Sequence, residues 1–123
     1  MSGDRRAAAR VFGLRAEWIA AALLRAKGYR ILERNFTVNG GEIDLIALRG
    51  NVIAFVEVKA RPTMDQARNA IDATKRRRMS VAAARWLAGK DWAMQKILRG
   101  DAVFVAPGCW PRHALAVVEL RMG

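Results

Sequence analysis

The chain has 123 residues, enough for one domain with one hydrophobic core. Lysine and arginine number 22 against 11 acidic residues, and the formal net charge of +11 predicts a polyanionic partner, either nucleic acid or an acidic membrane surface. The only cysteine, Cys109, excludes an intrachain disulfide and a cysteine-based zinc cluster. The only histidine, His113, argues against a histidine-rich metal site, and we interpret both residues as parts of a loop rather than as a catalytic dyad.

An amphipathic helix is predicted for residues 4–27, a segment rich in alanine that Gly28 ends. Its apolar series follows a helical period and consists of Val11, Leu14, Trp18 and Ala22. Glu17 lies beside this series, where it either points toward the edge of a neighbouring sheet or stays solvated. Gly13 lies one turn earlier on the same side, where the missing side chain permits close approach of another backbone.

Residues 18–24 form the longest uncharged apolar run near the start of the chain, and this run is too short to span a bilayer. Charged residues flank the run, and no signal-peptide cleavage pattern follows it. We therefore expect a cytoplasmic protein without a membrane partner.

Three strands are predicted after this helix, at residues 29–36, 41–47 and 54–61. Glycine-containing turns separate them, at residues 39–41 and 49–51. Residues 52–56 form an unbroken apolar run, which is typical of a strand covered on both faces. The second and third strands can pair as a hairpin, because the turn between them is short.

Charged side chains interrupt these two apolar strands. A two-residue period puts the following on one face of each strand: Glu42, Asp44 and Ile46 on the second, and Phe55, Glu57 and Lys59 on the third. In a hairpin, Asp44, Glu57 and Lys59 converge at one patch. Such charges are costly to bury unpaired, so Lys59 either neutralises a carboxylate in a structural ion pair or belongs to a functional site. Three acids and one lysine on adjacent strands favour a site.

Pro62 ends the third strand, and residues 63–66 have the form of a capping box, so a helix begins there. The alanine-rich segment extends to Gly89 as one helix, or as two with a break near residues 72–74. Residues 92–98 are ambiguous, residues 99–105 and 115–120 are predicted strands, and residues 107–111 are a loop between them. The order of elements predicts one α/β domain over residues 1–123.

The pattern of Asp44 followed by Glu57-Val58-Lys59 resembles the metal motif of the PD-(D/E)XK nuclease superfamily. A wider frame resembles the YraN family of small bacterial proteins, which is related by fold to archaeal Holliday-junction resolvases. That frame comprises Gly13, Glu17, residues 28–35, 41–46 and 55–61, Lys75, and Arg99-Gly100-Asp101. The resemblance implies a restriction-endonuclease-like core, a mixed β-sheet flanked by helices in the order αβββαββ.

The resemblance also implies a metal-dependent site for phosphodiester hydrolysis. Asp44 and Glu57 would bind Mg²⁺ or Mn²⁺, with the backbone carbonyl of Val58 as a further ligand. Glu17 would complete the metal site from the helix. Lys59 would position the nucleophile or stabilise charge on the phosphoryl oxygens. Glu42 is either an outer ligand or a brace for the turn.

Basic residues near this site are candidates for holding the nucleic-acid backbone, and they are Arg61, Lys75, Arg76 and Arg77. The run at residues 75–78 is otherwise a solvated helix face. No base-reading module is evident, so a structure-selective endonuclease acting on junctions, flaps or single strands is expected, with DNA favoured over RNA. Cutting two strands would require two sites, which makes a homodimer an attractive hypothesis.

The sequence leaves two alternatives open. One is a non-catalytic nucleic-acid-binding module that acts with a larger DNA-processing partner, and the other is a protein-interaction scaffold whose acidic cluster is structural. The chain also departs from the family pattern. Ile43 stands where proline precedes the aspartate, and Gly100 stands where the family carries phenylalanine, which predicts a looser fourth strand.

Overall fold

The computed structural model describes residues 2–121, with side chains from residue 12 onward except at residue 14. The elements are α1 (Ser2–Ala26), β1 (Arg30–Val38), β2 (Gly41–Arg49), β3 (Val52–Ala60), α2 (Met64–Arg68), α3 (Ala73–Leu87), α4 (Asp91–Met94), β4 (Ile97–Val105) and β5 (Arg112–Val118). The predicted succession of a helix, three strands, a helical segment and two strands is confirmed. The resulting five-stranded mixed sheet flanked by helices is consistent with a restriction-endonuclease-like fold. Within residues 2–121, no helix has both the length and the apolar character needed to cross a membrane.

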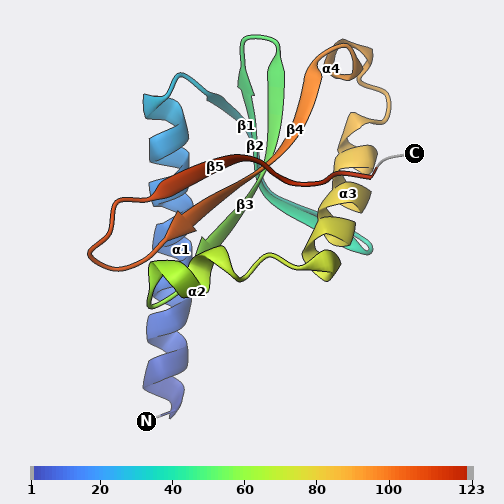
Figure 1. Ribbon diagram of the computed structural model, residues 1–123. Coiled ribbons are helices and arrows are strands. Elements are labelled where there is room, and N and C mark those ends of the chain that lie inside the picture. Colours follow the sequence, from blue (N-terminus) through green and yellow to red (C-terminus); the bar gives the residue numbers. More distant parts are fainter. Residues whose placement is uncertain (1, 122–123) are drawn as a thin grey trace.

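The strands lie in the order β1-β2-β3-β4-β5. The first three strands pair antiparallel as two consecutive hairpins, and β5 pairs antiparallel with β4. β3 and β4 are parallel, which requires the crossover connection that α2, α3 and α4 form. Figure 1 shows the result: α1 lies on one side of the sheet and α3 on the other. The sheet is therefore the middle layer of the molecule.

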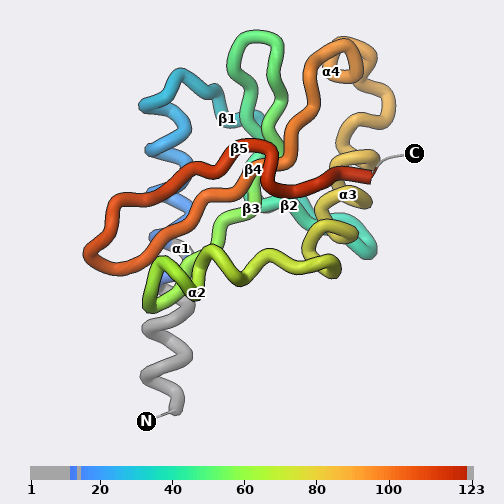
Figure 2. The backbone as a smooth tube through the Cα atoms, in the orientation of Figure 1, coloured from blue at the N-terminus to red at the C-terminus, as the bar shows by residue number. Residues whose placement is uncertain are grey.

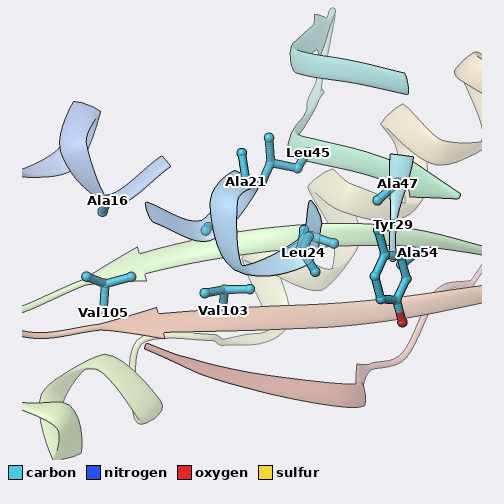
Figure 3. Close-up of a cluster of buried hydrophobic side chains, with 11 residues drawn as sticks. Ala16, Ala21, Leu24, Tyr29, Leu45, Ala47, Ala54, Val103 and Val105 are labelled. Carbon is cyan, nitrogen blue, oxygen red and sulfur yellow. The ribbon is translucent and has the colours of Figure 1, made fainter. Parts of the chain in front are cut away.

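Small side chains of α1 close one face of the sheet. Ala16, Ala20 and Ala21 are buried together with Leu24 against apolar residues of β2, β3 and β4, as Figure 3 shows for most of this cluster. Tyr29, just after the helix, joins the same cluster. Alanines let the helix approach the strands closely, so the sheet itself supplies most of the large side chains in this core.

The prediction that Trp18 and Ala22 lie on the buried face of α1 is wrong. Trp18 is 64% exposed, and Ala22 is exposed as well. The guanidinium carbon of Arg34 lies 4.6 Å from the centre of the Trp18 ring, a cation–π contact on the outer surface of α1. The remaining members, Val11 and Leu14, lie outside the residues whose side chains are described.

The other face of the sheet packs against α3. Phe55 of β3 meets Trp86 of α3 edge to face, with ring centroids 6.0 Å apart, and Met79 is buried in the same cluster. Gly41 lets α3 approach β2, because a Cβ at Gly41 would lie 2.6 Å from the carbonyl oxygen of Arg78. This close approach brings the basic first half of α3 next to the charged end of β2.

The alanine-rich segment forms two helices, which settles the alternative that the sequence left open. Each has a side-chain N-cap: Thr63 Oγ1 accepts from the backbone N–H of Gln66 at 3.2 Å, and Asp72 Oδ1 from that of Lys75 at 3.0 Å. The ambiguous residues 92–98 divide between α4 and the start of β4. Figure 2 shows the chain after β5 crossing toward α3, where the Ser80 hydroxyl accepts a hydrogen bond from the N–H of Arg121.

Two expectations about the last strands are wrong. His113 lies inside β5, which starts three residues before the predicted strand, and its side chain is 2% exposed rather than part of a loop. Gly100 does not loosen β4, since a Cβ there would lie 2.2 Å from the carbonyl oxygen of Val118. Glycine is the residue that allows β5 to pass this close to β4.

Candidate functional site

A cleft of about 690 Å³ lies where α1 faces the ends of β2 and β3. Six of the charged residues proposed from the sequence line it: Glu17, Asp44, Glu57, Lys59, Arg61 and Lys75. They come from two helices, two strands and the segment after β3, so only the fold brings them together. The volume is in the range of pockets that accept small ligands or a segment of a larger one.

Asp44 lies at a break in the sheet. On one side, the pairs that flank it place Asn35 of β1 opposite, and Asn35 has a left-handed backbone with φ of 50°. On the other side, the regular pairing of β2 with β3 ends at Leu45 and Val56. Asp44 Oδ2 then accepts a 2.7 Å hydrogen bond from the backbone N–H of Val58. The side chain thus satisfies a donor that the ladder leaves free.

This break also corrects the predicted face of β2. Ile43 and Ile46 both pack in the cluster against α3, whereas Leu45 and Ala47 pack in the cluster against α1. Strict alternation therefore fails between Ile43 and Ile46, and the expectation that Ile46 continues the face of Asp44 is wrong. The irregular backbone turns the Asp44 carboxylate into the cleft beside α1.

The environment of Asp44 penalises its negative charge. Burial, followed by the nearby Glu57 carboxylate, raises the pKa of Asp44 from 3.8 to about 7, and Glu17 adds to the effect. The hydrogen bond from Val58 acts in the opposite direction but is outweighed. Two carboxylates in this position repel each other, and a cation between them would relieve that repulsion.

Glu57 is the most deeply buried acid of the cleft, at 1% exposed. Its Oε1 lies 3.0 Å from Nζ of Lys59 and 3.3 Å from Nζ of Lys75. Its Oε2 is buried and has no hydrogen-bond partner within the described part of the chain. Lys59 does form the ion pair with a carboxylate that the structural alternative required. The pair nevertheless leaves Oε2 of Glu57 without a partner, and a buried, unsatisfied carboxylate oxygen lowers the stability of the fold. A purely structural ion pair would not be expected to leave it so.

Glu42 lies outside the cleft lining, next to it. Its Oε1 is 3.0 Å from Nζ of Lys75 and 3.7 Å from Nη2 of Arg78. The hydrogen bond from Lys75 lowers the pKa of Glu42. Glu42 therefore orients Lys75, which bridges it to Glu57, and this geometry favours a bracing role over that of an outer metal ligand.

The basic residues proposed to hold nucleic acid separate into two groups. Arg61 and Lys75 line the cleft, and Nη1 of Arg61 donates to the carbonyl of Ala60 at 2.7 Å. Arg76 and Arg77 do not line it, because they project from α3 toward other hollows. Only the first group lies beside Asp44 and Glu57.

The acids of the cleft supply the oxygen ligands that a divalent metal ion such as Mg²⁺ prefers. Among the described residues, no group of three or more His, Cys, Asp or Glu side chains is arranged to hold a metal ion by itself. Magnesium is commonly held by one or two carboxylates, with water and substrate phosphate completing its shell. Asp44 and Glu57 fit that requirement, and the partnerless Oε2 of Glu57 provides an available lone pair. Glu17 faces them from α1 across the cleft.

Gly13 also lines the cleft, one helical turn from Glu17. A Cβ at this position would have no heavy atom within 4 Å, so the expected close approach of another backbone does not occur. The missing side chain leaves the cleft wider instead.

Sequence reasoning missed a second buried polar network, outside the cleft. Asp101 is fully buried and accepts hydrogen bonds from Arg99, from His113 and from the backbone N–H of Ala116. Arg99 also donates to the hydroxyl of Tyr29 at 2.6 Å. The signal in the sequence was the Arg-x-Asp alternation within an apolar strand, since a buried Asp on a central strand needs partners.

Taken together, the fold and the cleft define an α/β protein with a restriction-endonuclease-like sheet and a cluster of acids and lysines where two of its strands end. The profile of the uncharacterised protein family UPF0102 matches residues 16–105, and the chain belongs to this family. UPF0102 is the PD-(D/E)XK-like family named YraN above, so the predicted relationship is confirmed.

Individual members of the family align over nearly the whole chain. A UPF0102 protein of Methylocella silvestris is 57% identical over 120 residues, which cover 98% of this chain and 97% of the relative. One from Methylorubrum extorquens is 59% identical, with 97% and 93% covered, and one from Bradyrhizobium diazoefficiens is 44% identical, with 97% and 90% covered. This chain and these relatives are therefore of similar extent.

Proposed function

We propose that the cleft hydrolyses phosphodiester bonds of nucleic acid with the help of a divalent metal ion. The observation that carries the proposal is the Glu57 carboxylate: it is buried, it faces Asp44, and its Oε2 has no hydrogen-bond partner among the described residues. Asp44 and Glu57 would hold Mg²⁺ or Mn²⁺. Bound there, the metal ion would polarise the phosphate and acidify a water molecule.

The residues around this pair have separate roles in the proposal. Lys59 holds Oε1 of Glu57 at 3.0 Å, which fixes the carboxylate and leaves a positive charge beside the scissile phosphate. The Val58 N–H orients Asp44, and Glu42 orients Lys75. Arg61 and Lys75 would neutralise the substrate backbone at the cleft. Glu17, on α1, is the group best placed to receive a proton from the attacking water or to bind a second ion.

The preference for DNA over RNA, and for junctions, flaps or single strands over a defined sequence, belongs to this proposal. Contacts from Arg61 and Lys75 to phosphates fix the position of the strand and carry no base information. The cleft is lined by helix and strand ends rather than by a helix that could enter a major groove. Shape of the substrate is therefore the feature that such a site would select.

A second candidate is a nucleic-acid-binding module that cuts nothing by itself. One observation favours it: Lys59 and Lys75 both contact Oε1 of Glu57, so lysines already supply part of the charge that a metal ion would supply. A larger DNA-processing partner would then provide any chemistry. This candidate predicts salt-sensitive binding without metal-dependent cleavage.

The test is a cleavage assay with Mn²⁺ and Mg²⁺ on single-stranded, flapped, junction and duplex substrates. Asp44→Asn and Lys59→Ala are compared with the wild type and with Lys96→Ala, which removes a lysine outside the cleft. We expect metal-dependent cutting by the wild type and Lys96→Ala, reduced at least about a hundredfold in the other two. Equal cutting by all four proteins would contradict the proposal, and binding without cutting would favour the second candidate.

A further inference from the structure

A second hollow, of about 570 Å³, lies on the β5 side of the α2–α3 connection. Its floor is apolar and includes Ile71 and Phe104, from the small cluster in which α2 packs on β4. Its rim carries three arginines from three elements: Arg68 of α2, Arg76 of α3 and Arg112 of β5. Figure 1 shows α2 beneath the loop that joins β4 to β5.

The hollow carries an excess of positive charge, with three arginines and one acid in its lining. None of the three guanidinium groups forms an ion pair with a carboxylate of the side chains that the structure describes. Asp72 is the one acid in the lining, and its Oδ1 is engaged as the N-cap of α3. By contrast, Arg99, elsewhere on the sheet, is paired with Asp101 at 2.8 Å. Arg68, Arg76 and Arg112 therefore hold their donors available for an external anion.

The hollow and the cleft are neighbours on the surface. Lys75 lines the cleft, and the next residue of α3, Arg76, lines the hollow. The first turn of α3 thus contributes one basic side chain to each depression. The protein as a whole has a formal charge of +11, so an acidic polymer is drawn to this surface over a long range.

We infer that the hollow binds the phosphate backbone of the nucleic acid at a second place, outside the cleft. This inference rests on the proposed function, because it assigns to the same substrate a further contact. Arg68, Arg76 and Arg112 pair with phosphates, and the apolar side chains of Ile71 and Phe104 contact the sugars between them. A strand held at both places makes more phosphate contacts than the cleft alone provides, so the hollow would lengthen the bound segment.

The experiment measures binding in EDTA, so that no cutting occurs, by fluorescence anisotropy of a labelled DNA flap over a range of salt concentrations. The wild type is compared with Arg68→Gln/Arg112→Gln and with Arg112→Lys, which keeps the charge. Arg85→Gln is the matched control, since Arg85 is an exposed arginine of α3 that lines neither hollow nor cleft. All variants change exposed side chains and are expected to melt as the wild type does.

Each lost phosphate contact should reduce the slope of log K against log salt by about 0.9, and weaken binding at about 0.1 M salt by roughly tenfold. The double variant should therefore lose about two units of slope, while Arg112→Lys and Arg85→Gln keep the slope of the wild type. A double variant that binds like Arg85→Gln would overturn the inference and leave the cleavage proposal standing. A wild type that does not bind the flap at any salt concentration would overturn both.

Discussion

Nε2 of His113 lies 2.8 Å from Oδ2 of Asp101, and both side chains are almost completely buried between β4 and β5. The other ring nitrogen, Nδ1, contacts the ammonium group of Lys27 at the end of α1. His113 thus contacts Lys27 through one ring nitrogen and Asp101 through the other. This one histidine therefore joins the end of the first helix to the edge of the sheet.

Asp101 should make the protein sensitive to acid. Burial acts to raise the pKa of Asp101, but the hydrogen bonds from His113, Arg99 and Ala116 outweigh it and lower the pKa to about 2. The folded-state pKa is below the unfolded value, so the stabilisation is present above about pH 4 and is lost as pH falls toward 2. It amounts to about 2 kcal/mol in full, of which about 1 kcal/mol disappears between about pH 5 and pH 3.

Urea unfolding at several pH values measures this loss. Asp101→Asn has no carboxyl to titrate and should be less stable than the wild type near neutral pH, by about 3 kcal/mol, because Arg99 loses its partner. Its stability should then fall less steeply with acid. If the free energy of unfolding fell equally steeply with decreasing pH in both proteins, Asp101 would not be the source of the acid sensitivity.

Asp44, in contrast to Asp101, should make the metal-free protein less stable as the pH rises. Burial and the Glu57 charge raise its pKa to about 7, above the unfolded value, so its favourable contribution is complete below about pH 4 and is lost as pH rises through 7. Asp44→Asn removes the ionisation and keeps an acceptor for the Val58 N–H. In EDTA at about pH 8 the variant should be more stable by roughly 2 kcal/mol, and the difference should vanish near pH 4. Thermal melts at both pH values provide the measurement, and a variant less stable at pH 8 would contradict the assignment.

Two glycine substitutions should have opposite effects. Gly100→Ala places a Cβ 2.2 Å from the carbonyl of Val118, so β5 must move and the free energy of unfolding should drop by about 3 kcal/mol. Gly13→Ala meets nothing within 4 Å in a helix and should stabilise the protein by up to about 1 kcal/mol. Urea unfolding of both variants compares them directly. A Gly100→Ala protein as stable as the wild type would mean that β5 does not pack as described.

The cleft could be predicted from the sequence because its central residues are close along the chain. Asp44, Glu57 and Lys59 lie on two strands joined by a tight turn, and charged residues in apolar strands stand out. The order of helices and strands could also be predicted, because the periodicity of apolar residues that marks each element lies within a short segment. The break at Asp44 was not predictable, because it depends on Asn35 of a neighbouring strand and on where two ladders end.

Pairings between distant segments account for the other errors. The partner of Asp101 is His113, and no local pattern distinguishes a histidine in a short edge strand from one in a loop. The inner face of α1 consists of alanines, whose small side chains give a weak apolar signal, so the exposed Trp18 dominated the predicted series. Gly100 acts through Val118, which is reached only after the loop between β4 and β5.

The most direct test of the proposed site is a calorimetric titration with Mn²⁺ near pH 8, because it needs no knowledge of the substrate. We expect the wild type and Glu33→Gln, which alters an exposed acid of β1, to bind Mn²⁺ with the same affinity. Asp44→Asn and Glu57→Gln should lose at least about a tenfold factor in affinity while remaining folded. Equal affinity in all four proteins, or no binding by the wild type, would contradict the claim that Asp44 and Glu57 hold a divalent metal ion.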